Sequence, residues 1–203
     1  MTHADEPTLR VFQSVDLLNN QLQLIDIIAN PDRIQYGRKR LTSVFKFFHK
    51  HARLFEERAI NKQIRIKLHG QSYGQFHSFE SFNFLPLILL DNAIKYSLED
   101  KDIHLTINDK EGSSEVEVIV SSFGPIVKPE NHKKIFDKYF RDDNARYFSN
   151  QGQGIGLFLA QQVALAHGFT ISYNCLFPET VRNMTIGRNE FSFRIPIESY
   201  DTE

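Results

Sequence analysis

The chain has 203 residues, a formal net charge of −1 and a single cysteine, Cys175. Near-neutral charge argues against bulk binding to nucleic acid or to an anionic membrane. One cysteine excludes an internal disulfide framework and a cysteine-based metal site. The longest apolar run, "FLPLILL", is too short to span a bilayer, and the N-terminus lacks signal-peptide character. We therefore expect a cytoplasmic location, with any membrane tether of the parent protein outside this chain.

Residues 8–29 carry apolar side chains in a heptad pattern, which predicts an amphipathic helix that packs on another helix. The "NPD" at 30–32 ends this helix, because proline disfavours helical geometry in the residue before it. We predict two parts: a helical stem over residues 1–31 and a globular domain over 32–203. The heptad positions are Val11, Val15, Leu18, Leu22, Ile25 and Ala29.

The rest of the chain mixes helical and strand-like patterns. Apolar spacing predicts helices over 33–59, 79–98, 129–138 and 155–167. Strand-like alternation covers 64–68, 103–107, 116–120, 169–175 and 191–197, with turns expected at 108–114, 168 and 178–183. This order is not a regular alternation of strands and helices. It predicts an α+β fold, a two-layer α/β sandwich whose mixed, largely antiparallel sheet carries helices on one face.

Three polar side chains share one side of the helix predicted over 79–98. Asn92, Lys95 and Tyr96 are three and four residues apart, opposite the apolar Leu89 and Ala93. An asparagine carbonyl suits Mg²⁺, and a lysine one turn on can meet phosphate. Taken alone, the same residues also fit an ordinary solvated helix face.

Two further segments fit either a ligand site or plain surface structure. Gly124 and Pro125 follow a strand, where a tight reversal would let a flat ligand lie against bare backbone, or would simply form a surface turn. In "KIFDKYFRDDNAR", Phe136 anchors a charged loop that carries the mobile cations Arg141 and Arg146. An aromatic core with solvated arginines explains that loop equally well.

Glycines occupy alternate positions 152, 154 and 156 at the start of the helix predicted over 155–167. Backbone N–H groups at a helix N-terminus, with the positive end of the helix dipole, form an anion site, and glycines let a phosphate approach. The pattern is neither a P-loop nor a dinucleotide fingerprint, since no Gly-Lys-Ser/Thr follows and no first strand precedes it.

Taken together and in this order, the four segments resemble a known family. "DNAIKYS", "SSFGPI", "IFDKYFR" and "GQGIGL" are similar to the N, G1, F and G2 boxes of the ATP-binding domain of sensor histidine kinases. The resemblance covers about residues 33–197. It implies the Bergerat-type ATP-binding fold of the superfamily that includes gyrase, Hsp90 and MutL, and an ATP-dependent protein histidine kinase that acts in two-component signalling.

The resemblance also implies roles for individual residues. Asn92 would bind Mg²⁺ at the ATP phosphates, Lys95 would contact phosphate, and Arg141 would approach it from a lid over residues 137–153. These three carry the expected catalytic roles. The residues expected to bind nucleotide are Asn92, Lys95, Tyr96, Ser122, Gly124, Ile126, Phe136, Gly152, Gln153, Gly154, Ile155, Gly156 and Leu157.

Three positions depart from the family pattern. Ser122 replaces the aspartate that usually reads the adenine amino group, and Ile126 replaces the second G1 glycine. Ile88 stands four residues before Asn92, where the family usually has a polar residue. An isoleucine can neither ligate metal nor act as a base, so gyrase-like ATP hydrolysis is not expected.

A phosphoacceptor histidine is not recognisable in this chain. His3 has its proline one residue too early, and His49 and His51 fall on a helix assigned to the ATPase domain. The helix over 8–29 resembles the second helix of a dimerisation hairpin. We therefore expect a homodimer through this helix, with a response regulator or an acceptor-histidine protein as partner. The alternatives are a non-catalytic nucleotide-binding regulator (a pseudokinase) and, third, a serine kinase of the anti-sigma type.

Overall fold

The computed structural model describes residues 25, 27, 29–112, 114–150, 152–181 and 184–197. Most of the predicted stem helix, residues 8–24, 26 and 28, therefore lies outside the described residues. Ile25, Ile27 and Ala29 have helical backbone geometry. Ile27 is buried with Ile34 in the hydrophobic core, whereas Ile25 is 60% exposed.

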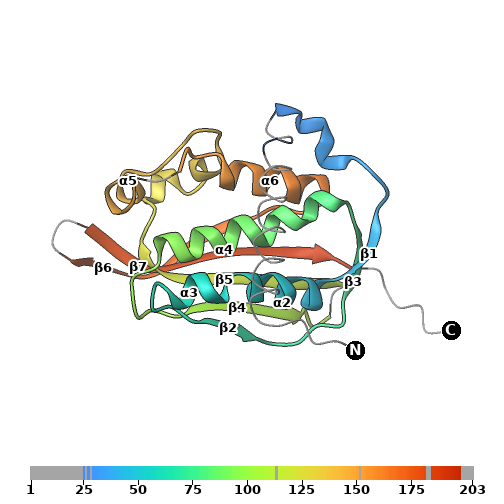
Figure 1. Cartoon of the computed structure of the whole chain (residues 1–203), viewed down its shortest axis with the longest axis horizontal. Coiled ribbons are helices and arrows are strands. Elements are labelled where there is room, and N and C mark those ends of the chain that lie inside the picture. The colour runs from blue at the N-terminus through green and yellow to red at the C-terminus, as the bar shows by residue number, and fades with distance from the viewer. Residues whose placement is uncertain are drawn as a thin grey trace.

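The main sheet has five strands, in the spatial order β2, β4, β5, β7, β6 (Figure 1). Strands β2 and β4 are parallel, and the other neighbours are antiparallel. This arrangement confirms the predicted mixed, largely antiparallel sheet. The bounds are β2 Ile66–His69, β4 Ile103–Asp109, β5 Glu115–Pro125, β6 Ser172–Val181 and β7 Met184–Pro196; β1 Arg40–Ser43 and β3 Gln75–Ser78 form a separate antiparallel pair.

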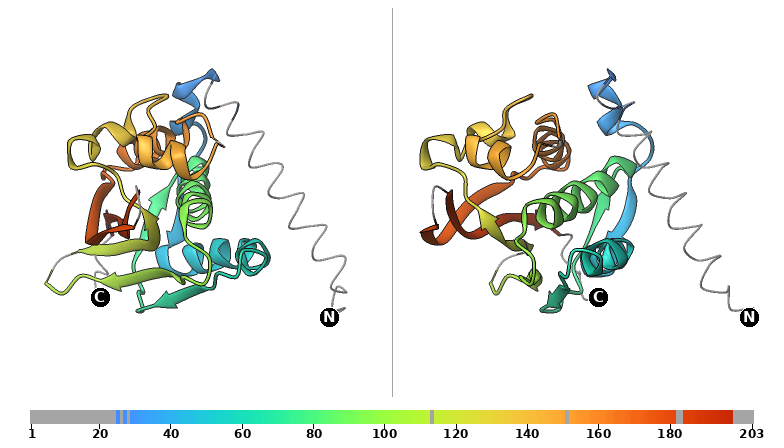
Figure 2. Two further views of the ribbon diagram at one scale, coloured as in Figure 1. Left: turned by 90° about the vertical axis from the view of Figure 1, so that its left-hand side faces the viewer. Right: turned by 60° about the vertical axis from the view of Figure 1, so that its left-hand side comes forward.

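The helices lie on one side of this sheet, with α4 between α2 and α6 (Figure 2). This layering confirms the α+β sandwich. The α-helices are α2 Val44–Leu54, α3 Glu56–Ile60, α4 Phe84–Tyr96, α5 Asp143–Phe148 and α6 Gly156–Ala166. Short 3-10 helices are η1 Pro31–Gln35, η2 Glu80–Asn83, η3 Pro129–Asn131 and η4 Lys134–Phe136.

Helix α4 is the centre of the core. Its apolar residues from Phe84 to Leu90 are all buried, as are Ala93 and Ile94. Leu85, Leu89 and Leu90 have no exposed surface, and burying a leucine side chain is worth about 1.5–3 kcal/mol. Packing on so many sides fixes the helix, and with it the polar face at its C-terminal end.

The predicted helix over 33–59 is wrong over residues 33–43. Residues 33–35 belong to η1, and residues 40–43 form β1, which pairs with a strand that was not predicted, β3. The polar run Arg38–Arg40 offers no apolar stripe, and Gly37 has φ of +92°, which no right-handed helix accepts. A regular helix therefore begins only at Val44.

Two strands are longer than predicted, and one predicted helix is not regular. Strand β5 does not reverse at Gly124–Pro125, because residues 122–125 pair with residues 186–189 of β7. Strand β6 likewise extends into the region 178–183 predicted as a turn, as far as Val181, and β7 begins directly after that region at Met184. The segment 129–138 forms η3 and η4 instead of one α-helix, with Pro129 and Glu130 opening the first of them.

A buried histidine joins α6 to the segment before α4. The Nδ1–H of His167 donates to the carbonyl of Val163 (2.7 Å), and its Nε2 accepts the N–H of Phe79 (3.0 Å). The bond from Phe79 needs a neutral imidazole, because a protonated Nε2 cannot accept it. Burial lowers the pKa of His167 from its ordinary value of 6.5, against the opposing effect of the bond to Val163. The unfolded chain therefore binds this proton more readily than the folded chain does.

We expect the free energy of unfolding to be intact above pH 6.5 and to fall as the pH drops below it, until the lowered pKa of His167 is passed. Urea titrations at about pH 7 and about pH 5 measure this loss. His167→Gln should lower stability at neutral pH by about 1–2 kcal/mol and reduce the pH dependence. The exposed His49→Gln is the matched control. An unchanged slope in the His167 variant would contradict this role.

Candidate functional site

A cavity of about 350 Å³ opens between α4, the ends of β5 and β7, the loop over residues 137–155, and the start of α6. Segments up to about 100 residues apart in the sequence thus meet at one hollow. Its lining residues are Asp91, Asn92, Ala93, Lys95, Tyr96, Ser122, Pro125, Val127, Ile135, Phe140, Arg141, Asp142, Ala145, Gly152, Gln153, Gly154, Ile155, Gly156, Leu157, Tyr173, Asn189 and Phe191.

The C-terminal end of α4 presents Asn92, Lys95 and Tyr96 to this cavity. Lys62, just after α3, fixes that end, because its Nζ donates to the carbonyls of Ile94, Lys95 and Ser97 at 2.7–2.9 Å. These are carbonyls that a helix end leaves without intrahelical partners. Burial lowers the pKa of Lys62. The lysine cap thus holds the three polar side chains in place from behind.

Gly124, Ile126 and Phe136 lie behind the cavity wall. A Cβ on Gly124 would overlap the carbonyl oxygen of Tyr96, so the glycine allows β5 and the end of α4 to touch. Ile126 lies over Gly187, where an added Cβ would be 3.0 Å from its Cγ2, and Phe136 packs edge-to-face against Phe191, which lines the cavity. These three residues shape the wall, and the other sequence-predicted positions line the cavity directly.

The loop over residues 137–155 is closed at its neck by backbone contacts. The N–H of Tyr139 donates to the carbonyl of Gly154 at 2.9 Å. Tyr139 and Gly154 both have positive φ, +67° and +72°, and a Cβ on Gly154 would lie 2.5 Å from the carbonyl oxygen of Phe140. A glycine is required at position 154 because the facing backbone of Tyr139 and Phe140 leaves no room for a side chain.

Arg141 holds this loop together from inside. Its Nη1 donates to the carbonyl of Gly152 (3.1 Å), and its Nη2 to the carbonyl of Ser149 (2.6 Å) and the hydroxyl of Tyr96 (3.3 Å). The Nη2 also reaches the carbonyl of Ala145 (3.2 Å). Within the described residues, its buried Nε has no hydrogen-bond partner. The guanidinium thus joins the loop to α4 and retains one buried donor without a partner among the described residues.

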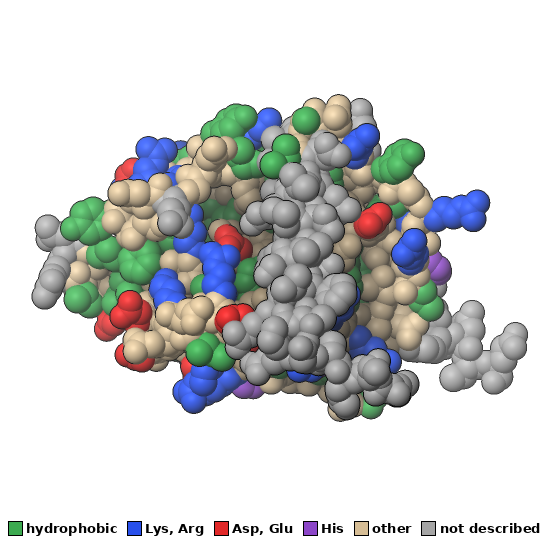
Figure 3. Space-filling view, in the orientation of Figure 1, with side chains coloured by type: hydrophobic (Ala, Val, Ile, Leu, Met, Phe, Trp, Pro, Cys, Tyr) green, Lys and Arg blue, Asp and Glu red, His purple; other side chains and the backbone are tan. Residues whose placement is uncertain are grey.

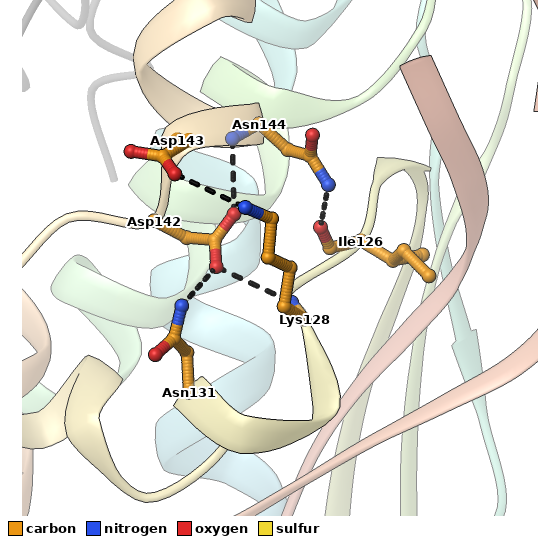
Figure 4. Close-up of polar contacts among 6 residues, drawn as sticks. All are labelled: Ile126, Lys128, Asn131, Asp142, Asp143 and Asn144. Carbon is orange, nitrogen blue, oxygen red and sulfur yellow. Dashed lines mark hydrogen bonds and ion pairs between the residues drawn. The ribbon is translucent and has the colours of Figure 1, made fainter. Parts of the chain in front are cut away.

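A buried carboxylate anchors the base of the loop to the segment after β5 (Figure 4). Asp142 is 2% exposed. Its Oδ2 accepts the backbone N–H of Lys128 (3.2 Å) and the side-chain amide of Asn131 (2.8 Å), while its Oδ1 caps α5 by accepting the N–H of Asn144 (2.9 Å). The Asn144 amide in turn donates to the carbonyl of Ile126 (2.9 Å). These bonds set where α5 begins relative to the cavity.

Replacing Asp142 with asparagine should loosen the loop, because an NH₂ group would then face N–H donors. We expect hydrogen exchange over residues 143–150 to accelerate by about tenfold or more. The matched control is Asp143→Asn, since Asp143 is exposed and makes a surface ion pair with Lys128, worth about 1 kcal/mol or less. Equal exchange rates in the two variants would contradict the anchoring role of Asp142.

Positive charge and backbone donors converge on one side of the cavity. The N-terminus of α6 opens at Gly156, and Lys95 lies against the backbone of Gly152. In the space-filling view, Lys and Arg side chains gather between α5 and the left-hand end of α4 (Figure 3). Ile88 packs beneath Gly156, where an added Cβ would be 3.4 Å from its Cγ2. This side is therefore suited to an anion with several charges.

The opposite wall, on β5, β6 and β7, combines aromatic and polar side chains, and it contains residues that the sequence did not single out. Asn189 and Phe191 alternate along β7 with outward residues, and Tyr173 is the cross-strand partner of Phe191. The two-residue spacing of Asn189, Phe191 and Phe193 in "NEFSF" could have indicated that these side chains share one face of a strand. The unpredicted lining residues are Asp91, Ala93, Pro125, Val127, Ile135, Phe140, Asp142, Ala145, Tyr173, Asn189 and Phe191.

Comparison with known proteins places this site in a family. Residues 87–199, more than half of the chain, match the model described as histidine kinase-, DNA gyrase B- and HSP90-like ATPase. The chain belongs to this ATPase family. The match includes most of α4, the closed loop and the glycine-led start of α6, so the chain carries the ATP-binding catalytic domain of a histidine kinase and the cavity lies within the matched region.

Curated relatives of this ATPase domain are sensor kinases. The chain is 29% identical over 132 residues to the signal transduction histidine-protein kinase ArlS of Staphylococcus haemolyticus, covering 56% of the chain and 28% of the relative. It is 39% identical over 88 residues to the sensor protein CiaH of Streptococcus pneumoniae, covering 43% and 19%. The matches thus span less than a third of these relatives' length.

Solved structures share the fold of the ATPase domain. The catalytic domain of histidine kinase ThkA has a TM-score of 0.62 at 22% identity, over 79% of this chain and 97% of that chain. The Acinetobacter baumannii histidine kinase AdeS has a TM-score of 0.61 at 17% identity, over 98% and 88%. Among the described residues, the structure has no helix long and apolar enough to cross a membrane.

Proposed function

We propose that this domain binds ATP with Mg²⁺ in the cavity and supplies the γ-phosphoryl group to a histidine of a two-component signalling pathway. The observation that carries the proposal is the cavity itself, which joins the Asn92 and Lys95 face of α4 to the glycine-flanked N-terminus of α6. The phosphates would lie on this charged side, and the base would lie against β5 and β7.

The donor set fits a magnesium ion held mainly by phosphate. Among the described residues, no three His, Cys, Asp or Glu side chains are grouped as metal ligands. Mg²⁺ at nucleotides needs only one or two protein oxygens, since waters and phosphates complete its shell. Asn92 offers an amide oxygen at the cavity, whereas the neighbouring Asp91 is paired with Arg58. When bound, the ion would neutralise phosphate charge.

The chain's own residues would position the nucleotide and exclude water. Phosphoryl transfer depends mostly on positioning and charge stabilisation. Lys95 would meet the phosphates from α4, and the donors at the start of α6 would meet them from the other side. Arg141 would contribute through a guanidinium whose Nε is unsatisfied among the described residues. The loop anchored at Asp142 would close over the bound nucleotide.

Ile88 argues for phosphate transfer to an acceptor over gyrase-like ATP hydrolysis. The side chain is buried and packs against the start of α6. It has no group that could activate a water for attack on the γ-phosphate. The nucleophile would therefore be the imidazole of the acceptor histidine, which approaches ATP from a separate element.

We further propose that the parent protein dimerises through the N-terminal helix, acts in the cytoplasm and works with a response regulator. Ile25 and Ala29, both positions of the predicted heptad seam, are exposed, while Ile27 is buried against the domain. The seam is thus open to a partner helix at these positions. Histidine kinase ThkA, which shares this fold, has been solved in complex with the response regulator TrrA (TM-score 0.59).

The proposal is tested by mixing the chain with labelled ATP, Mg²⁺ and a separate fragment that carries an acceptor histidine from a related kinase. We expect label on the fragment's histidine, and none on a fragment with that histidine replaced. ATP binding without transfer to any such fragment would contradict the kinase proposal and favour the non-catalytic regulator, a reading suggested by Ile88, Ser122 and Ile126.

A further inference from the structure

The wall of the cavity that would hold the base ends in a polar corner. On β5 and β7 the row of cross-strand pairs on this face runs from Val118–Phe193 through Val120–Phe191 to Ser122–Asn189. Alternate residues of paired strands share a face, so this last pair lies on the same side as the core. Ser122 is 7% exposed and Asn189 6%, and both line the cavity.

Tyr173 fixes the orientation of the Asn189 amide. The Tyr173 hydroxyl accepts the N–H of Val127 (3.0 Å) and donates to Oδ1 of Asn189 (2.5 Å). Burial raises the pKa of Tyr173, so the phenol keeps its proton and remains the donor. The amide nitrogen of Asn189 therefore faces away from Tyr173. It makes one long contact, 3.5 Å, with the carbonyl of Gly187, which leaves donor capacity toward the cavity.

The carboxylates at this cavity are already engaged. Among the described lining residues, Asp91 and Asp142 carry carboxylates. Asp91 is paired with Arg58. Asp142 accepts three N–H donors, two of them backbone groups, and is 2% exposed. The polar groups available to a purine at this wall are thus the hydroxyl of Ser122 and the amide of Asn189.

Whether a carboxylate or a hydroxyl and an amide face the base affects which purine the site accepts. Position 6 of adenine carries an amino donor, whereas position 6 of guanine carries an oxygen acceptor. A carboxylate only accepts, so it favours adenine and repels the guanine oxygen. A serine hydroxyl and an asparagine amide can each donate or accept, and Asn189 presents its donor side.

We infer that the nucleotide site accepts guanine as well as adenine, with Ser122 and Asn189 as the residues that set this tolerance. The inference rests on the proposed function, because it assigns the base specificity of the same site. GTP would then be a second phosphate donor for the domain.

Competition binding with a fluorescent ADP analogue tests this in the unmodified chain. ATP and GTP should displace the probe with dissociation constants within about tenfold of each other. Ser122→Asp should restore an acceptor-only group and weaken GTP relative to ATP by about 30-fold or more. If Ser122→Asp fails to fold, Asn189→Asp provides a second test. It adds a carboxylate at the neighbouring position and should also weaken GTP binding relative to ATP binding.

The outcomes separate the two proposals. Tight ATP binding with GTP weaker by more than about 100-fold in the unmodified chain would overturn the inference and leave the proposed function standing. If the unmodified chain has this preference for ATP and Asp142→Asn loses it, Asp142 is the residue that selects the base. Failure of both nucleotides and of the probe to bind would overturn the proposed function, and the inference with it.

Discussion

Replacing Asn92 with alanine is expected to weaken Mg²⁺-dependent ATP binding by at least about 100-fold, equivalent to ~2.7 kcal/mol. Asn92 would supply the side-chain oxygen for the ion, because the two carboxylates that line the cavity among the described residues, Asp91 and Asp142, are already engaged with other partners. Without the ion, the phosphate charges would face Lys95 and Arg141 alone. Phosphotransfer to an acceptor fragment should fall at least as far.

The loss in the Asn92 variant should be one of binding and not of folding. The side chain is half-buried at the cavity and lies outside the apolar core formed by α4, so the free energy of unfolding should change by about 0.5 kcal/mol or less. Asn61→Ala, an exposed position after α3, is the matched control and should bind ATP normally. ATP affinity in Asn92→Ala within about threefold of the unmodified chain would contradict the assigned role.

The second large effect is expected at the neck of the loop. Gly154→Ala places a Cβ 2.5 Å from the carbonyl oxygen of Phe140 and 2.8 Å from the backbone carbon of Tyr139. The neck must therefore open, which breaks the bond from Tyr139 to Gly154 and displaces the backbone that leads into α6. We expect nucleotide affinity to fall by about 30-fold or more, because the N-terminal donors of α6 lose their position.

Gly112 provides a close control for Gly154. Its φ is +73°, against +72° at Gly154, but a Cβ there meets nothing within 4 Å. Both alanine variants pay about 1–2 kcal/mol for the left-handed backbone, and only the variant at Gly154 adds the clash. Equal ATP affinities in the two variants, measured at matched folded fractions, would show that the neck does not position the site.

The sequence was sufficient where one local pattern determined one structural feature. Asn92, Lys95 and Tyr96 share a helix face because 3.6-residue periodicity allows little else. The three glycines predicted the start of α6, which begins at Gly156, because a run of residues without a Cβ leaves the backbone N–H groups of a helix N-terminus uncovered. The mixed sheet followed from the order of strands and helices, and the family resemblance joined these pieces into one domain.

Features that depend on contacts between distant segments could not be read from local patterns. Strands β1 and β3 stabilise each other across about 30 residues, and neither shows clear alternation. Asn189 and Tyr173 reach the site only because β6, β7 and β5 pair in one register. Arg141 was expected to approach the phosphates. Its bonds to the carbonyls of the loop depend on how that loop closes, and its role toward phosphate stays a prediction.

The most direct test of the central claim is calorimetric titration of the chain with a non-hydrolysable ATP analogue, with and without Mg²⁺. We predict one site per chain, with affinity that drops by about tenfold or more when a chelator removes the ion. We also predict that binding is lost in Asn92→Ala and retained in Asn61→Ala. An absence of binding in the unmodified chain, or binding that is indifferent to both Mg²⁺ and Asn92, would contradict the assignment of this cavity as a magnesium–ATP site.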